Sequence, residues 1–425
     1  MKYANWNVPE RGAEVPRALL AAGCTPLLAA ILHLRGLSDP AAARSFLRGG
    51  AETLTNPLEL TGMVDAVQRL TRAVATGEHV AVYGDYDVDG ITAACLLTDY
   101  LRFRGLTCEL YIPDRIRDGY GLNTAAIDTL AEKGVTLIVT VDCGVTNLEE
   151  TAYAAQRGVD MIVTDHHECH GELPQAIAAV NPHRPDSEYP FAELAGVGVA
   201  FKLICAVEQL LVPDDDRYLH RMCAEYADLV TVGTVADVMP LVDENRLIVS
   251  IGLGLLERGS RIGFDALIRA AALDGKNGKD GKNGGRSGGG TSGSDETEER
   301  HLTASSIGFG IAPRMNAAGR IRSASIAEEL LLTEDRGVAD EIAARLCDIN
   351  RERQELENAM AEEAFRMIEQ THDFASDRVI VLAGESWHHG VIGIVASRVT
   401  DRYGLPSILI SFDGGRVTSG LSNGD

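Results

Sequence analysis

Five short, mostly apolar runs divide the chain between residues 79 and 182, and segments of helical periodicity separate them. The runs are 79–84, 107–113, 136–141, 159–164 and 176–182. Their apolar residues follow one another instead of alternating with polar ones, which is typical of strands buried on both faces. Helical segments of about 10 to 15 residues lie between the first four runs. The pattern therefore predicts an α/β fold, with a parallel sheet flanked by helices.

The rest of the chain is predicted to be helical up to a second, smaller α/β unit. Residues 1–75 predict short helices joined by loops, and 196–211 and 223–241 predict helices that close the first domain. Residues 338–369 contain no Gly or Pro and are rich in Ala, Glu, Leu and Arg, so they predict one long connecting helix. Over 377–412 the order strand, loop, helix, strand indicates the start of a second α/β domain.

These patterns divide the chain into five parts. In order, they are an N-terminal helical segment, a large α/β domain, a low-complexity insertion, an inter-domain segment with the long helix, and an incomplete second domain. Their bounds are 1–75, 76–270, 271–300, 301–370 and 371–425. The insertion is rich in Gly, Ser and Asn and cannot bury a core, so we expect a flexible surface segment there.

Composition excludes some classes of protein. At 45% apolar residues, a chain of 425 residues can bury several cores, yet no stretch approaches the roughly 20 apolar residues of a membrane span. The eight cysteines include no CxxC pair and the N-terminus lacks the pattern of a signal peptide, which predicts a cytoplasmic protein with reduced thiols. The net charge of -23 argues against bulk coating of nucleic acid, but allows an enzyme with a local basic cleft.

The turn after the first apolar run contains three aspartates. Asp85, Asp87 and Asp89 alternate in the sequence GDYDVDG, where Gly90 allows a tight backbone. Their charges are costly to gather unless a cation or backbone N–H groups neutralise them. One such aspartate is usually a cap for the helix that follows, near Ile91. Three in a row after a buried strand favour a metal site.

Further acidic and histidine residues follow two other apolar runs. Asp142 follows the third run in VTVDCG, and Asp165, His166 and His167 follow the fourth in VTDHHE. Ligands gather just past the carboxyl ends of strands in open α/β sheets. A mixed set of carboxylates and imidazoles suits Mn²⁺ first and Mg²⁺ second. Two such ions sharing a carboxylate would activate a water for attack on phosphorus.

One more carboxylate is available from ADLVTVGTVADVMPL. Asp228 and Asp237 are both candidates, and for each the alternative is a helix cap. The segment 196–203, GVGVAFKL, contains Gly-x-Gly but follows no clear strand, so a dinucleotide site is not predicted there.

Seven segments resemble motifs of one enzyme family, and the first four named here follow the order that the family has. GDYDVDG, VTVDCG, VTDHHE and GTVADVMPL resemble the four motifs of the DHH phosphoesterases. IPDRIRDGYGLN, APRMNAAGRI and ESWHHGVIGIVASR resemble blocks of its RecJ branch. The resemblance runs from about residue 55 to the C-terminus, apart from the insertion. It implies a metal-dependent exonuclease that degrades single-stranded DNA from the 5′ end to 5′ mononucleotides, in recombination and repair.

The same resemblance assigns roles to the candidate ligands. The family's metal-ligand positions fall on Asp87, Asp89, Asp142 and His166. Asp142 would be shared by two ions, Mn²⁺ or Mg²⁺, and His167 would act on the phosphate or on the departing oxygen. The fourth motif would add one ligand, either Asp228 or Asp237. Asp85 matches no certain ligand and is expected outside the direct ligand set.

Residues that would hold the substrate lie in the later blocks. By resemblance, Arg115 meets the 5′-terminal phosphate, while Arg314 and Arg320 face the nucleic-acid backbone. His388 either contacts a phosphate or caps the following helix. A Ser-Gly-Arg-Ser stretch typical of the family corresponds here to Ser419–Ser422, with Leu421 in place of Arg. The family's later Gly-Gly-His block and OB-fold do not occur in the sequence, so we expect either a fragment of a longer protein or a shortened form with a weaker hold on DNA.

Two other functions are compatible with these residues. One is a DHH-type hydrolase of short oligonucleotides or small nucleotides, and the other is a non-catalytic nucleic-acid-binding relative. Every candidate ligand is present, which argues against the second. For the main hypothesis, the expected partners are single-stranded DNA, a single-strand-binding protein and a helicase, with no membrane association.

Overall fold

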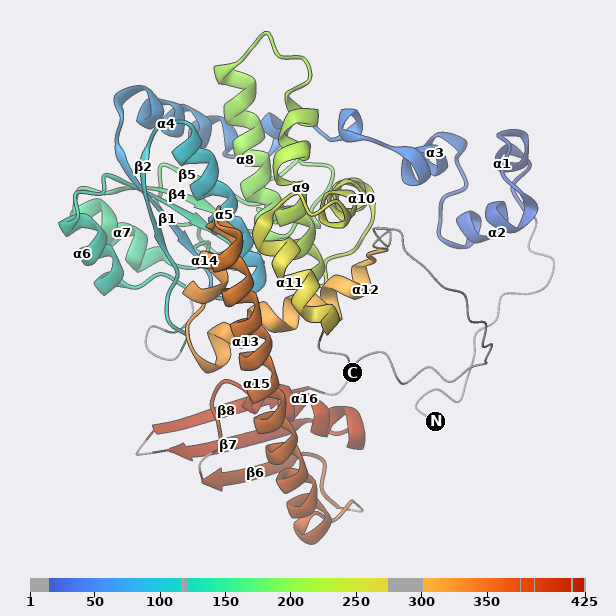
Figure 1. The fold of residues 1–425 in the computed structure, drawn as a ribbon, viewed down its shortest axis with the longest axis vertical. Coiled ribbons are helices and arrows are strands. Elements are labelled where there is room, and N and C mark those ends of the chain that lie inside the picture. The colour runs from blue at the N-terminus through green and yellow to red at the C-terminus, as the bar shows by residue number, and fades with distance from the viewer. Residues whose placement is uncertain are drawn as a thin grey trace, which may run out of the picture.

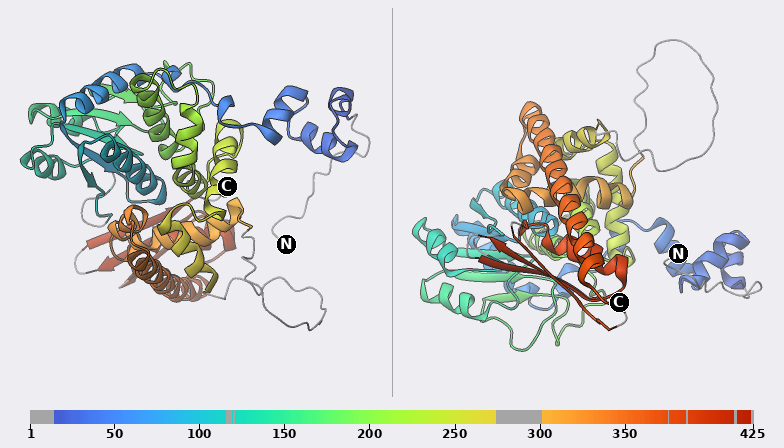
Figure 2. Two further views of the ribbon diagram at one scale, coloured as in Figure 1. Left: turned by 45° about the horizontal axis from the view of Figure 1, so that its top comes forward. Right: turned by 90° about the horizontal axis from the view of Figure 1, so that it is seen from below.

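The computed structural model of the protein describes residues 15–115, 119, 121–273, 301–374, 376–385, 387–413 and 416–423. The predicted N-terminal helices are confirmed as α1 (Arg17–Ala21), α2 (Pro26–Leu34) and α3 (Pro40–Arg48). They enclose a small core of their own, made of Leu19, Ala29, Leu32 and Ala43. This three-helix unit projects from one side of the molecule (Figures 1 and 2), and α3 contacts the main body, where Arg246 Nε donates to the Phe46 carbonyl oxygen at 2.8 Å. Two short 3₁₀ turns, η1 (Ala51–Thr53) and η2 (Pro57–Glu59), lead from this unit to α4 (Met63–Thr76).

The five predicted strands are confirmed, and they form one parallel sheet. Strands β1 (His79–Gly84), β2 (Thr107–Tyr111), β3 (Leu137–Val141), β4 (Asp160–Thr164) and β5 (Ala178–Val180) are ordered β2-β1-β3-β4-β5. Each neighbouring pair is parallel. Because β1, β3 and β4 are neighbours, the loops that follow their carboxyl ends meet at one edge of the sheet.

Side chains of the sheet contribute to two hydrophobic cores, one on each face, because successive residues of a strand point to opposite faces. Val80 and Val82 belong to the main core, while Ala81 and Tyr83 belong to a second one. Helices α5 (Val88–Phe103) and α8 (Gly196–Leu211) contribute to the main core, and α6 (Thr124–Glu132) and α7 (Leu148–Gln156) cover the second. Figure 1 shows these two pairs on opposite sides of the sheet. The predicted sheet flanked by helices is therefore confirmed.

A second layer of helices packs outside α5 and α8. The predicted helix α9 (Tyr218–Ala236) contacts both of them. Helices α10 (Asp243–Glu257) and α11 (Ile262–Leu273), which the sequence pattern did not identify, follow it and complete the layer.

The predicted long helix is confirmed as α15 (Arg336–Thr371). The Asp335 carboxylate begins it by accepting the N–H groups of Gly337 and Val338 at 2.7 and 3.0 Å. Before it come α12 (Ala304–Ser306), the π-helical turn η3 (Ile307–Ile311), α13 (Ala312–Ile321) and α14 (Ser325–Leu332). Helix α15 contacts α11, α13 and α14, and also elements of the second sheet, so it joins the two sheets as predicted (Figure 1).

The second α/β unit has the predicted order strand, helix, strand, followed by one more strand. Strands β6 (Ile380–Glu385) and β7 (Ser407–Asp413) are parallel, and β8 (Arg416–Ser422) pairs with β7 in the antiparallel direction. Helix α16 (Ile392–Tyr403) contacts β7 and β8. Strand β8 was not predicted because its sequence, RVTSGLS, contains no apolar run.

The five-part division of the chain stays a prediction. Most of the insertion at 271–300 lies outside the described residues, so the flexibility expected for it also stays a prediction. Among the helices of the described ranges, none combines the length and apolar character that crossing a membrane requires.

Candidate metal centre and anion pocket

Three loops bring the predicted acidic and histidine residues to one edge of the parallel sheet. Asp85 directly follows β1, Asp142 directly follows β3, and Asp165 directly follows β4. Asp142 has a φ of 61°, in the left-handed region that a residue with a side chain occupies only at a cost. Its carboxylate is almost fully buried, with 3% of the side chain exposed. Strain and burial at one aspartate point to a functional role.

Seven side chains of this edge fall into three overlapping clusters. In each cluster, one potential ligand atom per residue lies within 4.8 Å of the others. The clusters are Asp85–Asp87–Asp142, Asp89–His166–Asp237 and Asp142–His166–His167. Asp142 and His166 each belong to two clusters, so the arrangement offers two adjacent ion sites with shared ligands.

The two residues that clusters share, Asp142 and His166, face each other without forming a hydrogen bond. His166 Nε2 lies 3.1 Å from Asp142 Oδ1, 3.7 Å from Asp237 Oδ2 and 3.9 Å from Asp89 Oδ2. Within the described residues, Asp142 Oδ1, His166 Nε2 and Asp85 Oδ1 are buried and have no hydrogen-bond partner. Burying a polar atom without a partner costs about 1–3 kcal/mol. A divalent cation would use these atoms, so the residues present fit a metal centre.

The electrostatics of the cluster agree with that assignment. Burial, together with the charge of Asp87, raises the pKa of Asp85 to about 7 and that of Asp237 to about 6. Burial and neighbouring carboxylates also raise the pKa values of Asp89 and Asp142 well above their ordinary range. Burial, and then the charge of His167, lowers the pKa of His166 to about 4, so this imidazole is neutral and can act as a ligand. A bound cation would offset the repulsion among the carboxylates.

Backbone N–H groups at the start of α8 hold one of the ligands. Asp89 accepts the N–H of Gly196 at 2.6 Å and that of Val197 at 3.0 Å. A Cβ atom at position 196 would lie 2.5 Å from both Cβ and Oδ1 of Asp142, so only glycine allows this approach. Gly233 of α9 similarly leaves room for Asp89 Oδ1, which would lie 2.7 Å from a Cβ there. The first glycine of GVGVAFKL, Gly196, therefore positions two ligands. Sequence reasoning had tested the Gly-x-Gly only as a dinucleotide motif.

Replacing Gly196 by alanine should weaken the metal centre without unfolding the protein. The new methyl group would displace Asp142, whose backbone already lies in the left-handed region, so we expect Mn²⁺ affinity to fall about 10- to 100-fold. Isothermal titration calorimetry with Mn²⁺ measures this. Gly198→Ala is the matched control, because a Cβ there meets only Leu194 side-chain atoms, at 3.4 Å or more. Equal affinity in the two variants would contradict the role given to Gly196.

Asp165 lies beside the clusters and orients His167. Its carboxylate accepts the N–H groups of Val145, His166 and His167 at 2.9, 2.8 and 3.1 Å. It also lies 2.7 Å from His167 Nδ1. This hydrogen bond is the largest cause that raises the pKa of His167. Burial acts most strongly on the pKa of Asp165 and in the raising direction, but the hydrogen bond and charge of His167 and the backbone N–H groups together lower that pKa. The His167 side chain is 45% exposed, which leaves it accessible to a substrate.

The structure separates the two candidates for the last ligand. Asp237 follows the end of α9 and joins His166 and Asp89 in a cluster. Asp228 lies within α9, is buried, and forms an ion pair of 2.8 Å with Arg261. Their separation of nine residues spans about two and a half helical turns, which directs the two side chains to opposite sides. The structure therefore brings Asp237, and not Asp228, to the metal centre.

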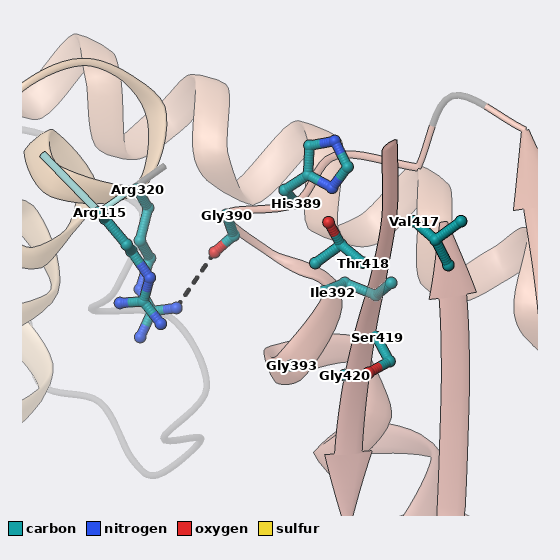
Figure 3. Close-up of a pocket in the computed structure, with 10 residues that line it drawn as sticks. All are labelled: Arg115, Arg320, His389, Gly390, Ile392, Gly393, Val417, Thr418, Ser419 and Gly420. Carbon is teal, nitrogen blue, oxygen red and sulfur yellow. Dashed lines mark hydrogen bonds between the residues drawn. The ribbon is translucent and has the colours of Figure 1, made fainter. Parts of the chain in front are cut away.

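A second candidate site lies between α13, the loop after β2, and the second sheet. It is a cavity of about 450 Å³ lined by Arg115, Arg320, His389, Gly390, Ile392, Gly393, Val417, Thr418, Ser419 and Gly420. Figure 3 shows the guanidinium groups of Arg115 and Arg320 side by side, across the cavity from β8. Burial, and then the charges of Arg115 and Arg353, lowers the pKa of Arg320 to about 10. None of the described lining residues has a carboxylate, so this cavity favours an anion.

Two predicted substrate residues do not line this cavity, and two residues that do line it were not predicted. Arg314 is buried, donates to the Gly310 carbonyl at 2.5 Å and lies 3.4 Å from Cys347 Sγ, so it is directed into the helical core. His388 Nδ1 accepts the Gly390 N–H at 3.0 Å, but Gly390 precedes α16, whose N-terminus at Val391 has no side-chain cap, so His388 does not cap that helix. His389 and Thr418 line the cavity and were not predicted. The adjacent histidines of ESWHHG were the only sequence signal for His389.

Known proteins resemble this chain both in the domain that contains the parallel sheet and over nearly its whole length. The model of the DHH family, N-terminal domain, matches residues 79–234. The chain is 39% identical over 389 residues to the single-stranded-DNA-specific exonuclease RecJ of Bacillus subtilis (strain 168), covering 92% of this chain and 45% of that protein. It is 34% identical over 420 residues to RecJ of Dickeya dadantii (strain 3937), covering 97% of this chain and 67% of that protein. The chain thus spans about half to two thirds of the length of these relatives.

Two solved structures share the fold over most of the chain. The crystal structure of RecJ in complex with Mn²⁺ from Thermus thermophilus superposes with a TM-score of 0.73 and 31% identity, covering 94% of this chain and 52% of that one. The crystal structure of exonuclease RecJ bound to manganese superposes with a TM-score of 0.68 and 33% identity, covering 83% of this chain and 80% of that one.

Proposed function

The chain belongs to the RecJ family of DHH proteins, and on this basis we propose that it is a metal-dependent exonuclease that hydrolyses single-stranded DNA from the 5′ end. The observation that supports this most directly is the shared position of Asp142 between two ligand clusters, next to a cavity with two guanidinium groups. The first feature suits phosphoester hydrolysis and the second suits a terminal phosphate. Together they fit an enzyme that removes nucleotides from a phosphorylated end.

Two ions, Mn²⁺ or Mg²⁺, would be held by the residues of the overlapping clusters. One would use Asp85, Asp87 and Asp142. The other would use Asp89, His166 and Asp237, with Asp142 added because its Oδ1 lies 3.1 Å from His166 Nε2. This set adds Asp85 to the ligands expected from the family motifs and leaves out Asp228. When bound, such ions lower the pKa of an attacking water and stabilise charge on the phosphoryl oxygens.

His167 is the residue that we assign to the departing oxygen. Asp165 holds its ring by the 2.7 Å contact at Nδ1 and raises its pKa, so His167 retains a proton more readily than a free imidazole does. A positioned, protonated imidazole can donate that proton to the 3′ oxygen of the departing nucleotide. Asp165 thus acts through His167 and does not contact the substrate.

The anion pocket would recognise the 5′-terminal phosphate and so set the direction of digestion. Arg115 and Arg320 supply the charge, and Ser419 supplies a hydroxyl group on the β8 side. Arginine binds phosphate well because its planar guanidinium group offers several donors. Leu421, at the position where the family has arginine, has 66% of its surface exposed. The pocket described here therefore relies on two arginines, and the stretch around β8 adds none at position 421.

Beyond the chemistry, we propose the biological setting from family membership. The substrate would be DNA single strands generated in recombination and repair, with single-strand-binding protein and a helicase as partners in the cytoplasm.

The experiment that tests this function is a Mn²⁺-dependent digestion of end-labelled, 5′-phosphorylated single-stranded DNA. A matched duplex and a dinucleotide are digested in parallel. Rapid release of 5′ mononucleotides from the single strand alone would support the proposal. Cleavage of the dinucleotide alone would replace it with a hydrolase of short oligonucleotides, and binding without cleavage would replace it with a non-catalytic relative.

A further inference from the structure

One aromatic residue connects the metal centre to the anion pocket. Tyr86 lies between Asp85 and Asp87 in the chain, so its backbone belongs to the metal-binding turn. Its ring lies under the guanidinium group of Arg115, with Arg115 Cζ 4.8 Å from the ring centroid. Arg115 in turn lines the anion pocket. A single residue therefore contacts a pocket arginine and is covalently continuous with two candidate metal ligands.

The backbone of Tyr86 also contacts the helix that supplies the second pocket arginine. A Cβ atom at Gly319 of α13 would lie only 3.1 Å from the Tyr86 carbonyl oxygen, so the two segments are in close contact. Arg320 is the next residue, and its Nη1 donates to the Gly390 carbonyl at 3.1 Å. Tyr86 thus contacts one pocket arginine through its ring and, through its backbone, the segment that contains the other.

Tyr83, three residues before Tyr86, has contacts typical of a purely structural role and serves as a comparison. Tyr83, at the end of β1, is fully buried, donates its hydroxyl proton to the Gly121 carbonyl and stacks on Tyr111. Tyr86 is only partly buried and has a cation over its ring.

On the basis of the function proposed above, we infer that Tyr86 is a positioning residue that holds Arg115 at a fixed distance from the metal centre. Arginine side chains are long and flexible, and a cation over an aromatic face is attracted by the negative potential of the ring. With Arg115 fixed, a terminal phosphate in the pocket places the next phosphodiester bond at the metal centre. Tyr86 would in this way determine that cleavage removes one nucleotide at a time.

Binding measurements without metal test this inference independently of catalysis. Fluorescence anisotropy in EDTA compares labelled pentanucleotides that carry a 5′ phosphate or a 5′ hydroxyl group. We expect wild type to prefer the phosphate. Tyr86→Leu, which keeps bulk but removes the aromatic face, should reduce affinity for the 5′-phosphorylated strand about tenfold and leave affinity for the 5′-hydroxyl strand unchanged. Tyr86→Phe should behave as wild type.

Product analysis adds a second readout. With Mn²⁺, we expect Tyr86→Leu to release a mixture of mono- and dinucleotides early in digestion, with a raised KM and little change in kcat, whereas Tyr86→Phe releases mononucleotides. Unchanged binding preference in Tyr86→Leu would overturn the inference. An equal loss for both strands together with weaker Mn²⁺ binding would overturn it too, because the ring would then only support the metal-binding turn.

The two proposals fail in different ways. If wild type prefers the 5′ phosphate in EDTA but digests no single-stranded DNA, the proposed function fails, and the anisotropy of Tyr86→Leu still decides the role of Tyr86. If wild type digests DNA but shows no preference for the phosphate, the proposed activity stands and the inference about Tyr86 is wrong.

Discussion

Replacing Asp142 by asparagine is expected to reduce exonuclease activity on the order of 1000-fold or more, because loss of a single preorganised electrostatic group already costs about 10²–10³ in kcat. Asp142 belongs to one cluster with Asp85 and Asp87, and its Oδ1 lies 3.1 Å from Nε2 of His166, a member of the other clusters, so its loss would affect both proposed ion sites. Asparagine has the same shape but lacks the charge and cannot bridge two cations. Initial rates on 5′-phosphorylated single-stranded DNA, with Mn²⁺ affinity from calorimetry, measure the effect.

The same substitution is expected to leave the metal-free protein at least as stable as wild type. Burial and nearby carboxylates raise the pKa of Asp142, which means that the folded state disfavours its charged form. Removing that charge relieves repulsion, so the midpoint of urea denaturation in EDTA should not fall. Asp128→Asn is a suitable control, because Asp128 lies on α6, away from the clusters, and contacts Tyr153 and Arg157. Asp142→Asn protein that is folded yet retains most of its activity would refute the shared-ligand role.

The parallel sheet was predictable because burial on both faces leaves a direct trace in the sequence. The runs that became β1, β3 and β4 are apolar almost throughout, and their side chains are buried along nearly their whole length. Strand β8 leaves no such trace, because small and polar residues such as Ser419 and Gly420 occupy it. Its position depends on pairing with β7 and on α16, which are contacts distant in sequence.

The candidate site was predictable in its residue types and less so in its geometry. Strand-end aspartates and the histidine pair are visible in the chain, and the structure places them together. Asp85 was expected outside the ligand set, because three aspartates two residues apart differ only through the path of the turn. The N–H groups of Gly196 and Val197, which hold Asp89, leave no signature, since every residue except proline has a backbone donor. Arg314 resembled a substrate contact by motif, yet its side chain is directed into the core.

The choice between Asp228 and Asp237 also required long-range packing. Both aspartates lie in motif-like sequence, and only Arg261, 33 residues after Asp228, identifies which of them has a structural partner. Arg261 donates to both Asp228 and the Glu225 carbonyl oxygen, so Asp228 neutralises a largely buried cation in the helical layer. The two aspartates should therefore respond to the same substitution in opposite ways.

Asp228→Asn is expected to destabilise the protein by about 3 kcal/mol, because breaking a buried ion pair leaves Arg261 without its counter-charge. Activity per folded molecule should stay close to wild type. Asp237→Asn should lower activity at least about 100-fold with little loss of stability, since burial and the charge of Asp87 raise the pKa of Asp237 and its charged form is disfavoured in the fold. Urea denaturation gives the stability, and initial rates with Mn²⁺ at a temperature where both variants are folded give the activity. If Asp228→Asn were the inactive and stable variant instead, Asp228 would be the ligand, and the ion pair with Arg261 would have to open in the working enzyme.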